Sequence, residues 1–223
     1  MERVKPKQGW DLTPRIDISR VLNGLAVLRP IFHSEADFQH ALAWQIHHEW
    51  PECSMRLEFK PPHSSERVYL DIWAADKDTV LAIELKYKTR GLEVTVQDED
   101  FHLLDQSAQD LARYDYLKDI QRLERVLSTN KVIAYAIFLT NDSAYWKQPM
   151  NNQTVDASFR IHQGRNLTGE LRWGTDASKG TTHGREASIL IKGAYDLNWQ
   201  NYSRIAETSY GTFKYLLVKV GSS

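Results

Sequence analysis

The stretch RVYLDIWAADKDTVLAIELKYK, residues 67–88, decides the fold, because it joins two runs of strand-forming residues that each carry charge where core residues are expected. Asp71 interrupts the first run, and Glu84 and Lys86 lie near the end of the second. Charges buried in a sheet are costly unless they are paired or bind a metal ion. These three charges therefore need a compensating partner.

The two runs predict strands over residues 67–75 and 79–88, joined by a turn at residues 76–78. Facing residues in such a hairpin have numbers that sum to about 155, so Asp71 is expected opposite Glu84. Two facing carboxylates repel each other unless a cation lies between them. Mg²⁺ is the expected cation, with Mn²⁺ able to replace it, because Mg²⁺ prefers hard oxygen ligands and keeps waters that can become nucleophiles.

Lys86 adds an ammonium group to the same face. Side chains alternate along a strand, so Glu84 and Lys86 project from one surface of the sheet. A lysine in this position can orient a water and stabilise the charge that develops on a phosphate. The run from Val80 to Ile83 is apolar on both faces, which predicts an internal strand whose charges enter a mostly buried environment.

The bulk properties predict a soluble globular protein with a single domain over residues 1–223. The composition is 42% hydrophobic and 26% charged, and no apolar run approaches the ~20 residues that span a bilayer. The N-terminus MERVKPKQGWDL lacks the apolar core of an export signal, and the single cysteine, Cys53, indicates a reducing cytoplasm. A net charge of −1 leaves a nucleic-acid partner open, because an acidic centre can offset a basic groove.

Hydrophobic periodicity and turn residues predict the elements around the hairpin. An N-terminal helical segment, residues 1–30, contains a packing helix over 16–29. A core of residues 31–142 follows the order αβββαβ, with its remaining elements expected as helices over 34–50 and 102–128 and strands over 54–61 and 131–142.

Residues 143–223 predict a β-rich C-terminal elaboration that extends the sheet. Its loops are expected over 143–158 and 172–184, and its strands over 159–162, 187–193 and 213–220. The whole chain is therefore expected to be α/β, with a mixed central sheet flanked by helices.

Asp71 and the triplet Glu84, Leu85 and Lys86, each on its predicted strand within the order αβββαβ, resemble the PD-(D/E)XK nuclease superfamily of restriction enzymes, junction resolvases and repair nucleases. The resemblance implies a restriction endonuclease-like fold over the predicted core. It implies that Asp71 and Glu84 are catalytic metal ligands, that the Leu85 backbone carbonyl is a further ligand, and that Lys86 positions the attacking water. Leu70 stands where the name-giving proline would be. The resemblance predicts a Mg²⁺-dependent nuclease, expected to be a DNA endonuclease of restriction, defence or repair type.

Two further carboxylates are candidates for this site. Helical spacing places Glu35 on the stripe that faces the sheet, so it is a candidate metal ligand. The same position also suits a carboxylate that complements the helix dipole. Glu58 is a weaker candidate, because Arg56 and Lys60 beside it indicate a solvated face.

Basic residues near the predicted site are candidates for phosphate contacts with nucleic acid. Double-strand cutting with one active site per chain implies a homodimer, and partner subunits of a defence or repair system are a further expectation. The candidates are Lys88 and Arg90, directly after the site, and Lys118, Arg122 and Arg125, on the helix face opposite the apolar stripe.

Three other interpretations stay open from the sequence. The charges can form ordinary salt bridges on a solvated sheet face. The chain can also be a nucleic-acid-binding or scaffold protein that keeps the fold without catalysis. A zinc site is the third interpretation, although the spacing of its residues matches no common zinc pattern; these residues are His40, His47, His48, Cys53 and His63.

Overall fold

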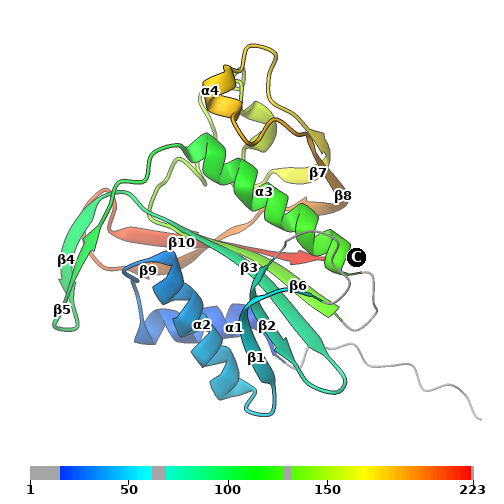
Figure 1. Ribbon diagram of the computed structural model, residues 1–223. Coiled ribbons are helices and arrows are strands. Elements are labelled where there is room, and N and C mark those ends of the chain that lie inside the picture. Colours follow the sequence, from blue (N-terminus) through cyan, green and yellow to red (C-terminus); the bar gives the residue numbers. More distant parts are fainter. Residues whose placement is uncertain (1–15, 62–68, 128–131, 222–223) are drawn as a thin grey trace, which may run out of the picture.

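The computed structural model describes residues 16–61, 69–127 and 132–221, and its centre is a six-stranded mixed sheet (Figure 1). The strand order is β1-β2-β3-β6-β10-β9, in which β3 and β6 are parallel and the other neighbours are antiparallel. The strands are β1 (Ser54–Phe59), β2 (Leu70–Ala75), β3 (Val80–Lys88), β6 (Val132–Thr140), β9 (Trp199–Arg204) and β10 (Thr212–Val220).

Helices cover both faces of this sheet (Figure 1). Helices α1 (Ile18–Leu28) and α2 (Glu35–Glu49) pack on one face, and α3 (Gln109–Val126) packs on the other. The predicted α/β class, with a mixed central sheet flanked by helices, is confirmed. Among the described residues, no helix is both long and apolar enough to cross a membrane.

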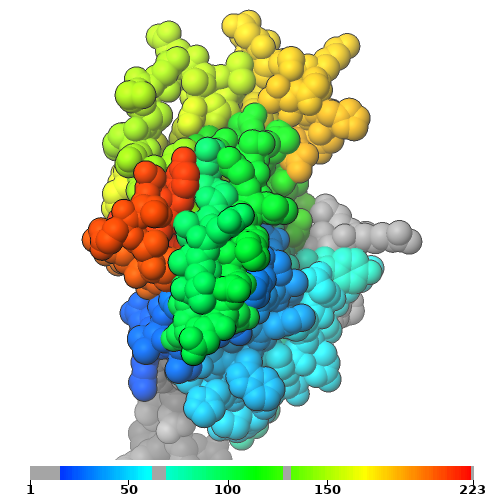
Figure 2. Space-filling view, turned by 90° about the vertical axis from the view of Figure 1, so that its left-hand side faces the viewer, coloured from blue at the N-terminus to red at the C-terminus, as the bar shows by residue number. Residues whose placement is uncertain are grey.

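A smaller lobe lies beyond α3. It contains the 3₁₀ helix η1 (Ala157–Phe159), the two-stranded sheet of β7 (Asn166–Leu171) and β8 (Ile189–Asp196), and the short helix α4 (Lys179–Thr182). In the space-filling view this lobe forms the top of the molecule, and the N-terminal helices lie below it (Figure 2). Helix α3 is therefore covered on two sides, by the central sheet and by β8.

The central hairpin has the predicted register. The pairs run from Ala75 with Val80 to Ile72 with Ile83, and the residue numbers of each pair sum to 155. Strand β3 lies between β2 and β6, and its residues from Leu81 to Leu85 are buried. The prediction of an internal strand that carries charge into the interior is therefore confirmed.

The start of α2 was also predicted correctly. The Ser34 hydroxyl accepts a hydrogen bond from the Asp37 N–H at 3.1 Å, as expected of an N-cap. The helix ends at Glu49, one residue before Trp50 and two before Pro51, because proline cannot continue a helix. This boundary positions Glu35 in the first turn of α2, at the end of β3.

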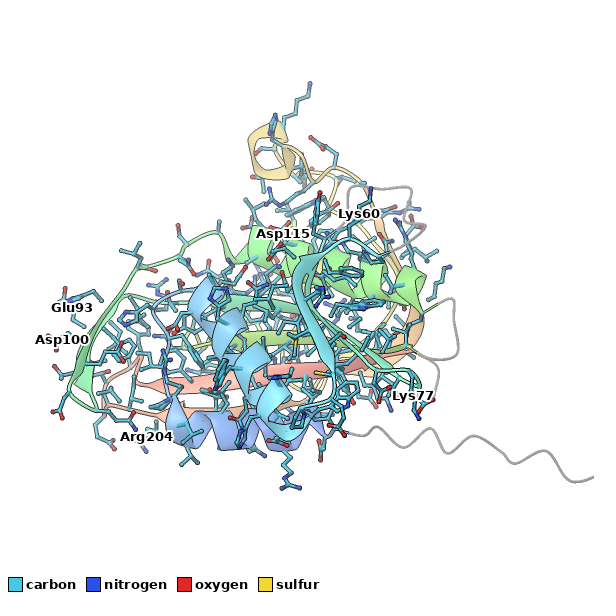
Figure 3. The ribbon with its side chains drawn as sticks, turned by 60° about the horizontal axis from the view of Figure 1, so that its bottom comes forward. Lys60, Lys77, Glu93, Asp100, Asp115 and Arg204 are labelled. Atoms are coloured by element: carbon cyan, nitrogen blue, oxygen red, sulfur yellow. The ribbon has the colours of Figure 1, made fainter. Side chains whose placement is uncertain are left out.

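The predicted helix over 102–128 is wrong at its start. A hairpin of β4 (Leu92–Val96) and β5 (Glu99–Leu103) follows β3, so the order αβββαβ is interrupted by two strands, and α3 begins only at Gln109. Gln97 and Asp98 at the turn have φ angles of 54° and 64°, as in the two-residue turns that match strand twist. The hairpin projects from the body, and Glu93 and Asp100 on it lie far from Asp115 on α3 (Figure 3).

The C-terminal elaboration differs from the prediction in several elements. Residues 159–162 form no strand, because this segment makes turn hydrogen bonds, such as Phe159 N–H to Asp156 O at 2.8 Å, while Phe159 and Ile161 are buried. Strands β7 and β9 and helix α4 were not predicted. The strands expected over 187–193 and 213–220 do form, as β8 and β10, but only β10 joins the central sheet.

Candidate functional site

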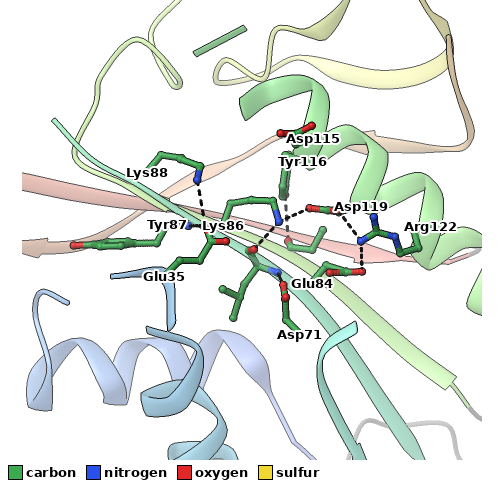
Figure 4. Close-up of polar contacts among 12 residues, drawn as sticks. Glu35, Asp71, Glu84, Lys86, Tyr87, Lys88, Asp115, Tyr116, Asp119 and Arg122 are labelled. Atoms are coloured by element: carbon green, nitrogen blue, oxygen red, sulfur yellow. Dashed lines mark hydrogen bonds and ion pairs between the residues drawn. The ribbon is translucent and has the colours of Figure 1, made fainter. Parts of the chain in front are cut away.

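The predicted site residues lie along the edge of β3 that faces β2, beyond the point where these two strands stop pairing. Strand β2 pairs with β3 as far as Ile83, and β3 continues beyond that pair. Two carboxylates take the next N–H groups of β3: Asp71 Oδ2 accepts from Leu85 N at 2.6 Å, and Glu35 Oε2 accepts from Tyr87 N at 2.8 Å (Figure 4). The beginning of β2 and the first turn of α2 thus bring both carboxylates to one strand edge.

The Leu85 carbonyl belongs to the same edge. Along a β-strand, the N–H and the C=O of one residue point to the same side of the strand. The Leu85 carbonyl therefore points to the side on which Asp71 binds the Leu85 N–H. The Leu85 carbonyl oxygen accepts a hydrogen bond from Lys86 Nζ at 3.1 Å. The Asp71 carboxylate and the Leu85 carbonyl therefore lie close to the Lys86 ammonium group.

Glu84 is the most deeply buried acid of the predicted set, with 2% of its side chain exposed. Its Oε1 accepts a hydrogen bond from Arg122 Nη1 at 2.7 Å. Burial, together with the charges of Asp119 and Asp71, raises the pKa of Glu84 well above its ordinary value, and Arg122 acts in the opposite direction. A guanidinium group thus compensates Glu84 within the protein.

Lys86 is paired with a residue that was not predicted. Its Nζ lies 2.8 Å from Asp119 Oδ2, and 17% of the lysine side chain is exposed. Burial by itself lowers the pKa of Lys86, but the carboxylates of Asp119, Glu35 and Asp71 outweigh burial and raise it. The ammonium group is therefore held in its charged form.

The pKa of Asp71 shows that its charged form is disfavoured at this edge. Burial raises the pKa of Asp71 to about 6, although Lys86 and the Leu85 N–H both favour its charged form. The charges of Asp119 and Glu35 make smaller contributions to this raised pKa. An added cation at this edge would relieve that repulsion.

Asp119 on α3 connects the two cations. Its Oδ2 contacts Lys86, and its Oδ1 accepts from Arg122 Nη1 at 2.9 Å. The sequence contains a signal for it, because Asp119 lies on the apolar stripe of α3, three residues after Tyr116 and four before Leu123. Asp119 thus resembles Asp71, because each is a charge at a position where an apolar core residue is expected.

Arg122 was predicted to lie on the helix face opposite the apolar stripe, but its side chain does not point to solvent there. It turns into the site because Glu84 and Asp119 both bind its guanidinium. Of the other two predicted phosphate contacts on α3, Lys118 is half-buried, and Arg125 is exposed and hydrogen-bonds to Gln121 at 3.3 Å. Only one of these three cations therefore reaches the carboxylates.

The predicted cations after the site divide in the same way. Lys88 Nζ lies 3.4 Å from Glu35 Oε2, so Lys88 borders the site. Arg90 lies further along the chain, where its Nε is 3.2 Å from Asp105 Oδ1 and its guanidinium carbon is 5.3 Å from the centre of the Tyr210 ring. Lys88 is thus the nearer candidate for a phosphate contact.

Glu58 is exposed, as expected, but its backbone is unusual. Its φ angle is 48°, in the left-handed region, and the pairing of β1 with β2 passes from Leu57 to Phe59. The amide of Gln39 donates to Glu58 Oε1 at 2.9 Å and to the Asp71 carbonyl at 2.7 Å. Gln39 thereby ties α2 to the backbone that carries Asp71.

The oxygen groups at this edge suit a divalent cation in chemical type. Asp71 and Glu84 supply two carboxylates and Leu85 supplies a carbonyl, which are the hard donors that Mg²⁺ prefers, and Mg²⁺ commonly binds few protein groups and keeps several waters. In the described part of the chain, no three His, Cys, Asp or Glu side chains are grouped to hold a metal ion. The set therefore fits a metal held by two carboxylates, a carbonyl and water, with Arg122 releasing Glu84.

The residues considered for zinc do not form such a group within the described ranges. His40, His47 and His48 are exposed on α2, and His47 Nδ1 lies 3.9 Å from Cys53 Sγ. His63 lies outside the described residues.

Comparison of the chain with models of protein families gives no match, and comparison with curated proteins gives none either.

Proposed function

We propose that this protein is a Mg²⁺-dependent nuclease that hydrolyses phosphodiester bonds, with DNA as the expected substrate, built on a restriction endonuclease-like core over residues 31–142. The observation that carries the proposal is the gathering of Asp71, Glu84, Lys86 and the Leu85 carbonyl at one strand edge. These are the residues that the resemblance to the PD-(D/E)XK superfamily singles out.

Burial argues against the interpretation of a solvated sheet face. Exposed ion pairs cost little and need no further role. Here Glu84 and Asp119 are 2% and 5% exposed, and Lys86 is 17% exposed. Buried ion pairs are often no more stabilising than apolar side chains of similar size. A functional role therefore explains these three buried charges better than a contribution to stability does.

Asp71, Glu84 and the Leu85 carbonyl would hold the metal ion, and Glu35 borders them through the Tyr87 N–H. Bound there, Mg²⁺ would supply Lewis acidity toward the phosphate and an acidified water. Lys86 would hold that water with its ammonium group and offset negative charge that develops on the phosphate.

Two other side chains have suitable positions for the substrate. Arg122 can bind a non-bridging phosphate oxygen when it releases Glu84, because a guanidinium matches phosphate geometry. Lys88 can contact a neighbouring phosphate from the end of β3. The proposal includes a homodimer, partner subunits of a defence or repair system, and a cytoplasmic location.

A substrate panel tests the proposed function. Single-stranded DNA, duplex DNA, branched DNA and RNA would each be incubated with Mg²⁺, Mn²⁺ or EDTA, using the parent protein and Asp71→Ala in parallel. We expect the parent protein to cleave at least one of these substrates in the presence of metal. Asp71→Ala should not cleave that substrate. Absence of cleavage across the panel, or equal cleavage by the variant, would overturn the proposal.

A second candidate function is a nucleic-acid-binding scaffold without catalysis. It is favoured by the fact that Lys86 and Arg122 both have carboxylate partners within the protein. In that case millimolar Mg²⁺ or Mn²⁺ would leave the melting temperature unchanged while nucleic acid still binds. A metal-dependent increase in melting temperature favours the nuclease.

A further inference from the structure

Asp119 contacts both cations of the site, Lys86 and Arg122. It comes from α3, on the opposite side of the site from Asp71, and its side chain is 5% exposed (Figure 4). Its two oxygens are divided between two cations, with Oδ2 toward Lys86 and Oδ1 toward Arg122. One carboxylate thus sets the direction of two long, flexible side chains.

The two cations contact two different groups of the proposed metal set. Lys86 Nζ donates to the Leu85 carbonyl at 3.1 Å, and Arg122 Nη1 donates to Glu84 Oε1 at 2.7 Å. A lysine side chain loses much rotational freedom when it is held in one conformation, and an ion pair at 2.8 Å supplies that restraint. Arg122 also keeps Asp119 as a partner if Glu84 turns to a metal ion.

The geometry points to Asp119 as a positioning residue of the site: it holds the Lys86 ammonium group against the Leu85 carbonyl and retains Arg122 beside Glu84. This inference rests on the proposed nuclease function. Asp119 is ion-paired with Lys86 and Arg122, so it acts through these two side chains. Its loss should therefore lower the rate of the chemical step more than the affinity for substrate.

The test compares Asp119→Asn and Asp119→Glu with a matched control on the same helix, Asp115→Asn. Asp115 also binds an arginine, Arg185, through two hydrogen bonds of 2.7 Å, and its charge acts on Asp119 electrostatically. Cleavage kinetics are measured in Mg²⁺. In parallel, metal-free protein is treated with an amine-reactive reagent, and mass spectrometry compares labelling of Lys86 with that of Lys77, an exposed residue at the far turn (Figure 3).

Asp119→Asn is expected to lower kcat by about 10- to 100-fold with little change in KM. Asp119→Glu should recover part of the rate, because it keeps the charge. Labelling of Lys86 relative to Lys77 should increase severalfold in Asp119→Asn and stay unchanged in Asp115→Asn. An unchanged kcat, or unchanged labelling of Lys86, would overturn the inference.

The labelling result separates the two proposals. If the parent protein cleaves nothing and Lys86 labelling still rises in Asp119→Asn, the nuclease function fails while Asp119 is shown to hold Lys86. If Asp119→Asn does not fold, Arg122→Gln is compared with the charge-balanced double variant Asp119→Asn/Arg122→Gln. Equal kcat and equal Lys86 labelling in those two proteins would again overturn the role of Asp119.

Discussion

Asp71 on β2 accepts a hydrogen bond from the Leu85 N–H on β3, with 2.6 Å between Oδ2 and N, at the point where pairing between these two strands ends. A carboxylate replaces a backbone partner there, so the strand edge is satisfied and a negative charge is fixed beside the Leu85 carbonyl. The site is thus a consequence of where β2 begins and its pairing with β3 stops.

Asp71→Ala and Glu84→Ala should each abolish metal-dependent cleavage while the fold survives. Each change removes one of two carboxylates that would share the metal, and the charge of Asp71 raises the pKa of Glu84. Cleavage rate and circular dichroism on the same preparation check this. Variants that are folded and cleave as fast as the parent would refute the assignment of these two residues.

Lys86→Ala should lower the cleavage rate by about 10² to 10⁴, in line with the loss of a positioned electrostatic group. Binding of metal and nucleic acid should change far less, because the carboxylates and the other cations remain. Lys86→Arg should not restore the full rate, since a planar guanidinium cannot reproduce a compact ammonium charge.

The competing role for Lys86 is purely structural. Its loss would leave the buried Asp119 carboxylate with Arg122 alone, and the variant would lose stability. Melting temperature, nucleic-acid affinity in Ca²⁺ and cleavage rate in Mg²⁺ distinguish the two roles. Normal cleavage per folded molecule would end the catalytic assignment.

Asp71→Asn should stabilise the metal-free protein at neutral pH. The pKa of Asp71 is about 6 in the folded state, against an ordinary value of 3.8, so the folded state binds more protons between these values and the free energy of unfolding falls as pH rises through this window. Asparagine removes that cost but can still accept from the Leu85 N–H. The gain at pH 7 should be on the order of 2 kcal/mol, or about 5 °C in melting temperature.

The pH dependence provides the control for this prediction. The difference between Asp71→Asn and the parent should disappear below about pH 4, where Asp71 is protonated in both states. EDTA must be present, because a bound divalent cation would stabilise the parent. A variant that is less stable than the parent at pH 7 would contradict the assigned pKa direction.

Arg122→Gln should strengthen Mg²⁺ binding, because the guanidinium group binds the Glu84 oxygen that the metal would need. Isothermal titration calorimetry should show an affinity higher by on the order of tenfold, which corresponds to about 1.4 kcal/mol. Nucleic-acid affinity in Ca²⁺ should fall in the same variant. Arg125→Gln, one turn away and exposed, is the control and should leave Mg²⁺ affinity unchanged.

Tyr87→Phe should destabilise the protein without altering the chemistry of the site. The Tyr87 hydroxyl donates to the Phe32 carbonyl at 2.9 Å in a buried position, so its removal leaves that carbonyl without this partner. The melting temperature should fall by on the order of 5 °C. Tyr69→Phe, at a half-exposed tyrosine, is the matched control.

The sequence by itself determined the parts of this protein that depend on neighbours along the chain. The register of β2 with β3 follows from a short turn and strict alternation, so the order of Asp71, Glu84 and Lys86 along two adjacent strands could be read directly. The start of α2 followed from the Ser34 cap, which also placed Glu35 in its first turn. These features are local, and local patterns specify them.

Only the tertiary structure decided which charges meet. The pairing of Lys86 with Asp119, and of Glu84 with Arg122, joins residues that are 33 and 38 positions apart, because α3 packs across β3. The β4–β5 hairpin was missed since Gln97 and Asp98 carry no glycine signal for their turn. Helical periodicity assigns a residue to a face, but burial and the nearest opposite charge decide where a long side chain such as Arg122 points.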